Sequence, residues 1–155
     1  MSDTGADAGM ELDNSVKLAI YTSVAETGKM PTIGTVAEAV GAPVANVKAS
    51  YARLYQNRVL VLQPDGISIR MAPPFSGVPT QHLVRAGGKE YFANCAWDSF
   101  GIVAALHADG EVLSRCEQSQ EPLRLRLSDG GLPPSTWLFH VPVPAAHWWR
   151  DIVYT

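Results

Sequence analysis

The chain has 155 residues, enough for one mid-sized domain or for two small ones that share a core without disulfide staples. Its two cysteines, Cys95 and Cys116, are too few for a secreted disulfide framework, and the N-terminal segment lacks the basic start and apolar core of a signal peptide. No apolar stretch approaches the roughly 18 residues of a membrane helix. The 12 basic and 15 acidic side chains give no long-range attraction to nucleic acid or to an anionic membrane. We therefore expect a soluble, cytoplasmic protein without a membrane partner.

The N-terminal half carries the pattern of three helices followed by a hairpin. Residues 1–10 are small, acidic and without apolar periodicity, which predicts a disordered leader. Apolar stripes predict a helix over about residues 14–27, a short helix capped by Thr32, and a third helix after Pro43. The turn residues 63–66, between two short apolar runs, predict a β-hairpin. This order of elements is typical of a winged helix.

The winged-helix-like unit, residues 11–72, raises the question of DNA binding, because such units commonly insert their third helix into the major groove. That helix offers Asn46, Lys48, Ser50 and Arg53, with Arg58 nearby. Residues 1–72, however, contain six basic and seven acidic side chains, whereas DNA-binding versions usually show a cationic stripe. We therefore favour a structural or dimerising role for this unit and keep DNA binding as the alternative.

The second half reads as a small mixed α/β domain over residues 81–155, separated from the first by a linker rich in proline and small residues at 73–80. A turn at Gly87-Gly88 predicts a hairpin that leads into a helix beginning near Asn94. Further strands are predicted at residues 111–115, 123–127 and 137–143. The expected fold class is α+β, with the winged-helix-like three-helix unit and its hairpin packed on the mixed α/β domain.

The stretch "YFANCAWDSF", residues 91–100, places Cys95 and Asp98 at the start of the helix predicted near Asn94. Unpaired backbone N–H groups and the helix dipole stabilise an anion there, so we expect a lowered thiol pKa for Cys95. Among aromatic side chains, Asp98 can stay protonated and donate a proton. A thiolate beside a protonated acid suits cleavage of a bond between carbon and a soft metal. The alternative is that Cys95 packs as a small hydrophobe and Asp98 caps the helix.

The run "YFANCAWDSFGIVAALHADGEVLSRCEQSQEPLRLRL", with "HWWRDIVYT" downstream, resembles the organomercurial (alkylmercury) lyase family. The most specific element is an aromatic-x-x-Cys-x-x-Asp helix start, followed further along by another cysteine. The resemblance implies that Cys95 attacks mercury, that Asp98 handles the proton for the carbon leaving group, and that Cys116 is mainly structural. It also implies a winged-helix-like unit before a mixed α/β lyase domain, and a second catalytic cysteine shortly after the segment in which this chain ends, at Thr155.

Aromatic side chains are candidates for the wall of an apolar substrate pocket: Tyr91, Trp97, Phe100 and Trp148. For Trp148 and Trp149 the favoured alternative is that both tryptophans close the core against the helix that begins near Asn94. A zinc site is only weakly indicated, because no closely spaced Cys or His pair is present to nucleate tetrahedral binding. Its candidate ligands would be Cys95, Cys116, His140 and His147.

The sequence thus predicts an organomercurial lyase-like protein that cleaves a carbon–mercury bond by protonolysis. Cys95 would bind the mercury of the substrate, Asp98 would act as the acid, external thiols would assist, and no organic cofactor would be needed. A relative in which the reaction is incomplete or repurposed is one alternative. Another is a non-catalytic regulatory protein, in which the winged helix binds DNA or a partner and the C-terminal domain senses a soft metal or a small apolar ligand.

Overall fold

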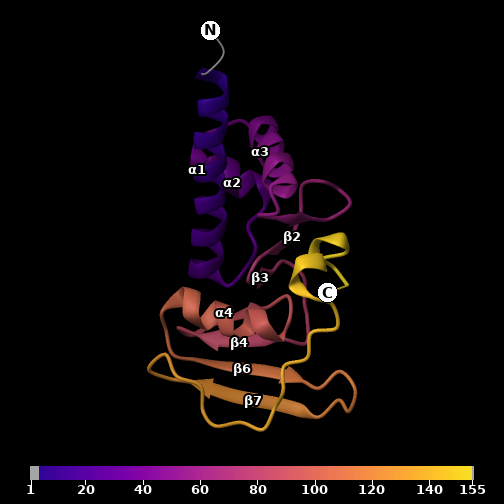
Figure 1. Cartoon of the computed structure of the whole chain (residues 1–155). Coiled ribbons are helices and arrows are strands. Elements are labelled where there is room, and N and C mark those ends of the chain that lie inside the picture. The colour runs from indigo at the N-terminus through magenta and orange to yellow at the C-terminus, as the bar shows by residue number, and fades with distance from the viewer. Residues whose placement is uncertain (1–3, 155) are drawn as a thin grey trace.

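The computed structural model describes residues 4–154 (Figure 1). The chain opens with three helices: α1 (Thr4–Thr27), α2 (Ile33–Val40) and α3 (Val44–Gln56). Gly28 ends α1 with a φ of 73°, and its N–H donates to the Val24 carbonyl at 2.8 Å. Thr32 caps α2 by accepting the Thr35 N–H at 3.1 Å. The structure therefore confirms the predicted C-terminal end of α1 and the predicted start of α2.

The start of α1 corrects one prediction. The helix begins at Thr4 rather than near residue 14, so the predicted disordered leader is helical over residues 4–10, while residues 1–3 lie outside the described part of the chain. The reason is physical: Ala, Met and Glu favour helix, and they extend a helix already fixed by packing of its later turns. Apolar periodicity detects buried helical faces and does not report a helical extension without an apolar stripe.

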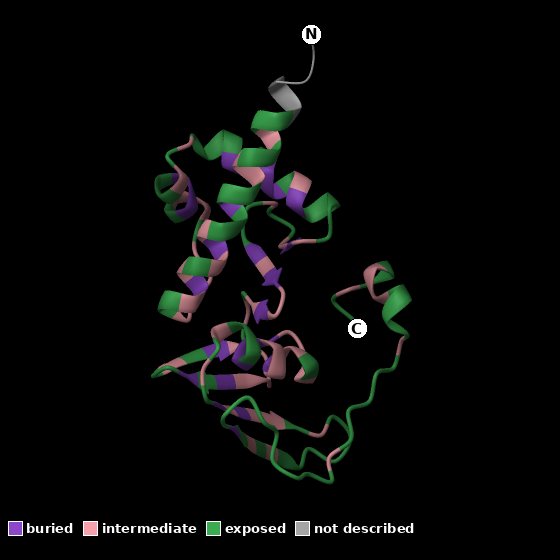
Figure 2. Cartoon of the chain, turned by 60° about the vertical axis from the view of Figure 1, so that its left-hand side comes forward, coloured by how far each residue is buried: buried purple, intermediate pink, exposed green. Residues whose placement is uncertain are grey.

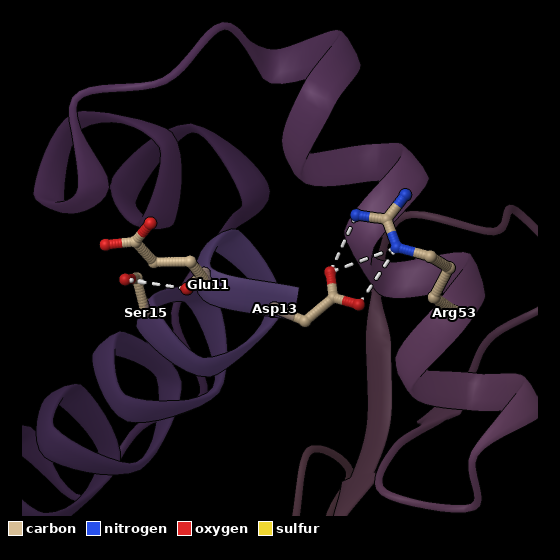
Figure 3. A network of polar contacts seen from close by, with 4 residues as sticks. All are labelled: Glu11, Asp13, Ser15 and Arg53. Atoms are coloured by element: carbon tan, nitrogen blue, oxygen red, sulfur yellow. Dashed lines mark hydrogen bonds and ion pairs between the residues drawn. The ribbon is translucent and has the colours of Figure 1, made fainter. Parts of the chain in front are cut away.

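The three helices enclose a first hydrophobic core. Val16 and Ile20 of α1 are completely buried against Val47 and Tyr51 of α3. At the edge of this core Arg53 donates to both carboxylate oxygens of Asp13, with the shortest N···O distance at 2.7 Å (Figure 3). The ion pair joins α1 to α3. It engages Arg53, which the sequence indicates as a candidate DNA contact.

A small antiparallel sheet follows, in the order β1-β2-β3: β1 (Val61–Leu62), β2 (Ile69–Ala72) and β3 (Phe75–Ser76). The predicted hairpin is therefore present, with Asp65 accepting the Ile67 and Ser68 N–H groups in its turn. The segment 73–80, predicted to be a linker, contains β3, and Phe75 forms a bridge with Ala93. This segment thus connects the two sheets through backbone pairing.

The second sheet is antiparallel in the order β5-β4-β6-β7: β4 (Leu83–Ala86), β5 (Lys89–Phe92), β6 (Gly110–Arg115) and β7 (Pro122–Leu127). Helix α4 (Ala96–Leu106) packs on β4 and β6, where Ile102, Val84 and Val112 are buried in a second core. The hairpin, the helix and these strands match their predicted positions. Gly110 is required under α4, since a Cβ there would lie 2.9 Å from Val103 Cγ2.

Helix α1 reaches both cores, because Val24 in its last turns belongs to the second one. The Tyr21 hydroxyl donates to the Pro73 carbonyl at 2.9 Å, and the Tyr91 hydroxyl of β5 donates to the Ala25 carbonyl at 2.8 Å. These long-range hydrogen bonds hold the end of α1 against the turn between β2 and β3 and against β5 of the second sheet. Among the described residues, no helix has the length and apolarity needed to cross a bilayer.

The C-terminal segment differs from its prediction. Residues 137–143 form no strand, and the segment continues to a 3-10 helix, η1 (Ala145–Arg150). Prolines at 142 and 144 cannot donate to a ladder, and the apolar side chains find no sheet face, so Leu138 is 91% exposed. Figure 2 shows this run as a long exposed stretch leading to η1.

Candidate active site

The candidate site lies at the start of α4, where Cys95 is the N-cap residue with extended backbone angles, φ −147° and ψ 178°. The Cys95 carbonyl accepts the Ser99 N–H at 3.3 Å, which begins the helix. The sequence predicted Asn94 as the cap and Cys95 in the first turn, so the cap lies one position later than expected. The thiol still stands at the N-terminal end of the helix, and Asp98 lies in the first turn beyond it.

The pKa of Cys95 departs from the prediction. Burial of the thiol raises its pKa, and the negative charge of Asp98 adds to that rise, while the backbone N–H groups of Asp98 and Trp97 act in the opposite direction. The net shift is upward, whereas the sequence predicted a lowered pKa from the helix end alone. The helix terminus is present as expected, but desolvation of the half-buried sulfur outweighs it.

The carboxyl of Asp98 is half-buried, and burial raises its pKa although Asn94 Nδ2 donates to its Oδ2 at 3.0 Å. Asn94 therefore orients the acid instead of capping the helix. Tyr21 of α1 also lies near this acid: burial and the charge of Asp98 both raise the tyrosine pKa. Sequence reasoning missed Tyr21, because nothing local marks a tyrosine within the apolar stripe of a distant helix.

The structure places the four candidate pocket residues in different parts of the molecule. Tyr91 is a core side chain, with its ring centroid 5.7 Å from that of Phe75, and Phe100 packs half-buried against the same core. Trp97, two positions after Cys95, is 59% exposed, and its ring centroid lies 5.6 Å from that of Phe139. Trp97 therefore meets another aromatic ring outside the core.

Trp148 lies in η1, where its Nε1 donates to the Val143 carbonyl at 2.7 Å. Its neighbour Trp149 faces the guanidinium of Arg58, 5.9 Å from the ring centroid. Neither tryptophan belongs to the two hydrophobic cores formed by the described residues. The prediction that both close the core against α4 is therefore wrong, because the proline-rich run before them directs the chain toward α3 and not onto the second sheet.

Cys116, which the resemblance implies is mainly structural, lies in the turn directly after β6 and is half-buried. Hydrogen bonds from Ser119, and the backbone N–H of Gln118, lower its thiol pKa; the Ser119 N–H lies 3.5 Å from Sγ. Among residues 4–154, no cluster of three or more His, Cys, Asp or Glu side chains is placed to hold a metal ion. The weakly indicated zinc site is therefore not assembled.

Two surface hollows lie away from Cys95 and Asp98. The first is lined by the β4–β5 turn and the adjoining ends of β6 and β7. The second, about 670 Å³, lies between α3 and the β1–β2 hairpin and includes Val153 from the C-terminal segment. The candidate site is instead a half-buried pair on α4, close to an exposed aromatic side chain.

The fold and the site together define a mixed α/β protein with a helical N-terminal unit, two small antiparallel sheets and a cysteine–carboxylate pair at a helix start. The family model described as alkylmercury lyase matches residues 75–155, more than half of the chain, and the chain belongs to this family. This confirms the resemblance on which the sequence prediction depended.

Among solved structures, one described as the mercury-bound form of MerB2 is similar, with a TM-score of 0.61 and 25% sequence identity. The match covers 82% of this chain and 68% of that one, so it extends beyond the matched family segment into the helical N-terminal unit. Comparison with curated proteins gave no match.

Proposed function

We propose that the protein is an organomercurial lyase, in which Cys95 binds the mercury of the substrate and Asp98 transfers a proton to the departing carbon. The observation that carries the proposal is the placement of this pair at the start of α4, inside the segment that matches the alkylmercury lyase family. The raised pKa values of both groups suggest the order of the two steps.

In the first step a resting thiol exchanges with the ligand X on the substrate R–Hg–X. The Cys95 sulfur forms a bond to mercury, X leaves with its electron pair, and the thiol proton passes to the Asp98 carboxylate. A carboxyl whose pKa is raised by burial is suited to accept that proton. Mercury favours the soft sulfur ligand, so the exchange itself is favourable.

In the second step the protonated Asp98 gives its proton to the carbon bound to mercury. The carbon–mercury bond breaks with its electron pair going to carbon, which yields R–H, mercury(II) on the Cys95 thiolate, and an Asp98 carboxylate ready for another cycle. Asn94 holds that carboxyl in place through its hydrogen bond. External thiolates then remove mercury(II), which favours a reducing compartment such as the cytoplasm.

We assign the N-terminal unit a structural role in this proposal. The arginine that the sequence offered for DNA, Arg53, is held by Asp13, and Ser50 is fully buried, so α3 presents fewer polar groups than its sequence indicated. The same helix α1 that carries Asp13 brings Tyr21 to Asp98. The unit therefore supports the site through α1, with no need for a nucleic-acid partner.

The test is release of benzene from phenylmercury in the presence of excess thiol, followed by gas chromatography. We expect turnover by the wild-type chain, no turnover by Cys95→Ser, and strongly reduced turnover by Asp98→Asn. Cys116→Ser is the matched control, since it removes the other thiol, which lies in the β6–β7 turn. Equal benzene release by the wild-type and the Cys95→Ser chains would overturn the proposal.

A further inference from the structure

The C-terminal strap, which we define as residues 132–154, is an exposed apolar segment with an unusual composition. Residues 130–149 contain no Asp, Glu, Lys or Arg, and the strap has no regular structure before η1. Its exposed large apolar side chains are Leu132, Leu138, Phe139, Val141, Val153 and Tyr154. A charge-free apolar run of this length on a surface indicates a functional contact and not solvation.

The strap touches the candidate site through Phe139. Its ring is tilted by 46° against that of Trp97, with 5.6 Å between centroids, a geometry that aromatic pairs favour. Trp97 stands between Cys95 and Asp98 in the chain, and its backbone N–H is one of the groups that act on the Cys95 thiol. Movement of Phe139 therefore changes the surroundings of the residue that separates the two reacting groups.

A second contact fastens the end of the strap to the N-terminal unit. Arg58, directly beyond α3, holds its guanidinium over the Trp149 ring, and it does so with a φ of 61°, a left-handed conformation that only glycine adopts freely. Val153 lines the hollow on α3 together with Tyr55 and Arg70. A strained arginine in place of the usual glycine is consistent with a side chain retained for this contact.

We propose that the strap covers the Cys95–Asp98 site, and that the Trp97–Phe139 pair determines which organic groups reach Cys95. That the substrate is an organomercurial rests on the function proposed above. That the strap covers Cys95 and Asp98 does not depend on that function. With Phe139 on Trp97 the strap narrows the approach to the thiol and offers aromatic surface to an apolar organic group. When the Phe139 and Trp149 contacts release, larger substrates enter.

The test measures how fast Cys95 reacts with thiol reagents in a Cys116→Ser background, where Cys95 is the remaining cysteine. Iodoacetamide serves as the small probe and dithiobis-nitrobenzoate as the bulky aromatic one. Loss of one aromatic or cation–π contact should raise the rate of the bulky probe roughly two- to tenfold in Phe139→Ala and in Trp149→Ala, with a smaller change for iodoacetamide.

Matched controls come from the same strap. Leu138→Ala and Tyr154→Ala remove side chains that are 91% and 73% exposed, and both should leave the two rates unchanged. Equal rates in Phe139→Ala and Leu138→Ala would overturn the proposal, as would equal acceleration of both probes. Labelling separates this outcome from failure of the lyase function. Faster labelling of the variants without benzene release from the wild type would support the covering strap and overturn the lyase function. Benzene release with unchanged labelling would support the lyase function and overturn the covering strap.

Discussion

Burial of the Asp98 carboxyl lowers the stability of the folded protein at neutral pH, and the direction of this effect can be tested. Its folded-state pKa is raised by burial, so its contribution to stability is fully present below the unfolded value of 3.8 and is lost as the pH rises through the folded pKa. Asp98→Asn removes the buried charge. We therefore expect this variant to unfold at a higher temperature than the wild type at neutral pH, with a difference that disappears in acid.

Asp65 supplies a control of opposite sign. Hydrogen bonds from Ser68, through its hydroxyl and backbone N–H, and from the Ile67 N–H lower the pKa of Asp65. Its stabilising contribution is present above the unfolded pKa and is lost as the pH falls through the folded one. Asp65→Asn should thus lower the melting temperature at neutral pH. If Asp98→Asn lowers the melting temperature at neutral pH as Asp65→Asn does, the assignment of Asp98 as a buried acid with a raised pKa is wrong.

At the scale of residues, the sequence predicts the pair but not its environment. The spacing of Cys95 and Asp98 at a predicted helix start makes them candidates, because helix ends are local properties, and the resemblance to the lyase family is what favours them over a structural role. The direction of the Cys95 pKa shift depends on burial by elements far along the chain, so a local argument gave the wrong sign. Tyr21 and Phe139 approach the site from distant segments, and no local pattern marks either.

The Asp13–Arg53 pair that joins α1 and α3 gives a prediction at the scale of elements. Burial raises the pKa of Asp13, but the hydrogen bonds of Arg53, the nearby Ser50 hydroxyl and the charge of Arg53 together outweigh it, so the pKa falls below its ordinary value. Arg53 is 40% exposed, and after allowance for solvent screening Asp13→Asn should cost about 1 kcal/mol of unfolding free energy in urea at neutral pH.

The pH dependence and a neighbouring residue control this prediction. Because the folded pKa of Asp13 is lowered, the loss should shrink as the pH falls through that value. Ser15 lies on the same helix, and its exposed hydroxyl donates only to the Glu11 carbonyl four residues earlier (Figure 3), so Ser15→Ala should change stability by less than about 0.5 kcal/mol. A larger loss in Ser15→Ala than in Asp13→Asn would contradict the assigned role.

Two glycines that end helices separate backbone strain from close packing. Gly28 and Gly41 have φ values of 73° and 63°, so alanine at either position should cost about 1 kcal/mol through strain alone. At Gly28 a Cβ would also lie 2.6 Å from the Glu90 carbonyl oxygen, whereas Gly41 faces open space. Gly28→Ala should therefore be clearly the more destabilising in denaturant titrations. Equal losses of unfolding free energy in the two variants would mean that Gly28, at the end of α1, is not in close contact with β5.

Elements with local signals were predicted well, and elements without them were not. Thr32, Gly28 and the Gln63–Gly66 turn act through neighbouring residues, so the helix ends and the first hairpin follow from the sequence. The first turns of α1 carry no apolar periodicity from which a helix could be predicted. Residues 137–143 looked like an apolar strand, but strand formation requires a partner edge, and sequence alone does not show whether one is within reach.

At the scale of the whole molecule, α1 should couple the two cores into one cooperative unit. All four tryptophans lie at or beyond Trp97, so their fluorescence reports the C-terminal half. Ile20 is fully buried in the first core, and Ile20→Ala should cost about 2–5 kcal/mol. We expect this substitution to lower the unfolding midpoints of tryptophan fluorescence and of far-ultraviolet helical signal together.

The alternative for that experiment is that residues 73–80, predicted to be a linker, join two domains that unfold independently. Two independent domains would leave the fluorescence midpoint unchanged while the helical signal shifts. The strand β3 and the hydrogen bonds of Tyr21 and Tyr91 argue for coupling. Long-range contacts of this kind cannot be read from a proline-rich stretch, whose composition suits a linker and a sheet crossing equally.

The most direct test of the proposed chemistry is a single turnover without external thiol. The Cys116→Ser chain would be mixed with a stoichiometric amount of phenylmercury, the benzene released would be measured, and the intact protein would be weighed by mass spectrometry. We predict benzene in proportion to protein and a mercury adduct without the phenyl group, lost in Cys95→Ser. A phenylmercury adduct that persists without benzene would show that the protein binds the substrate and does not cleave it.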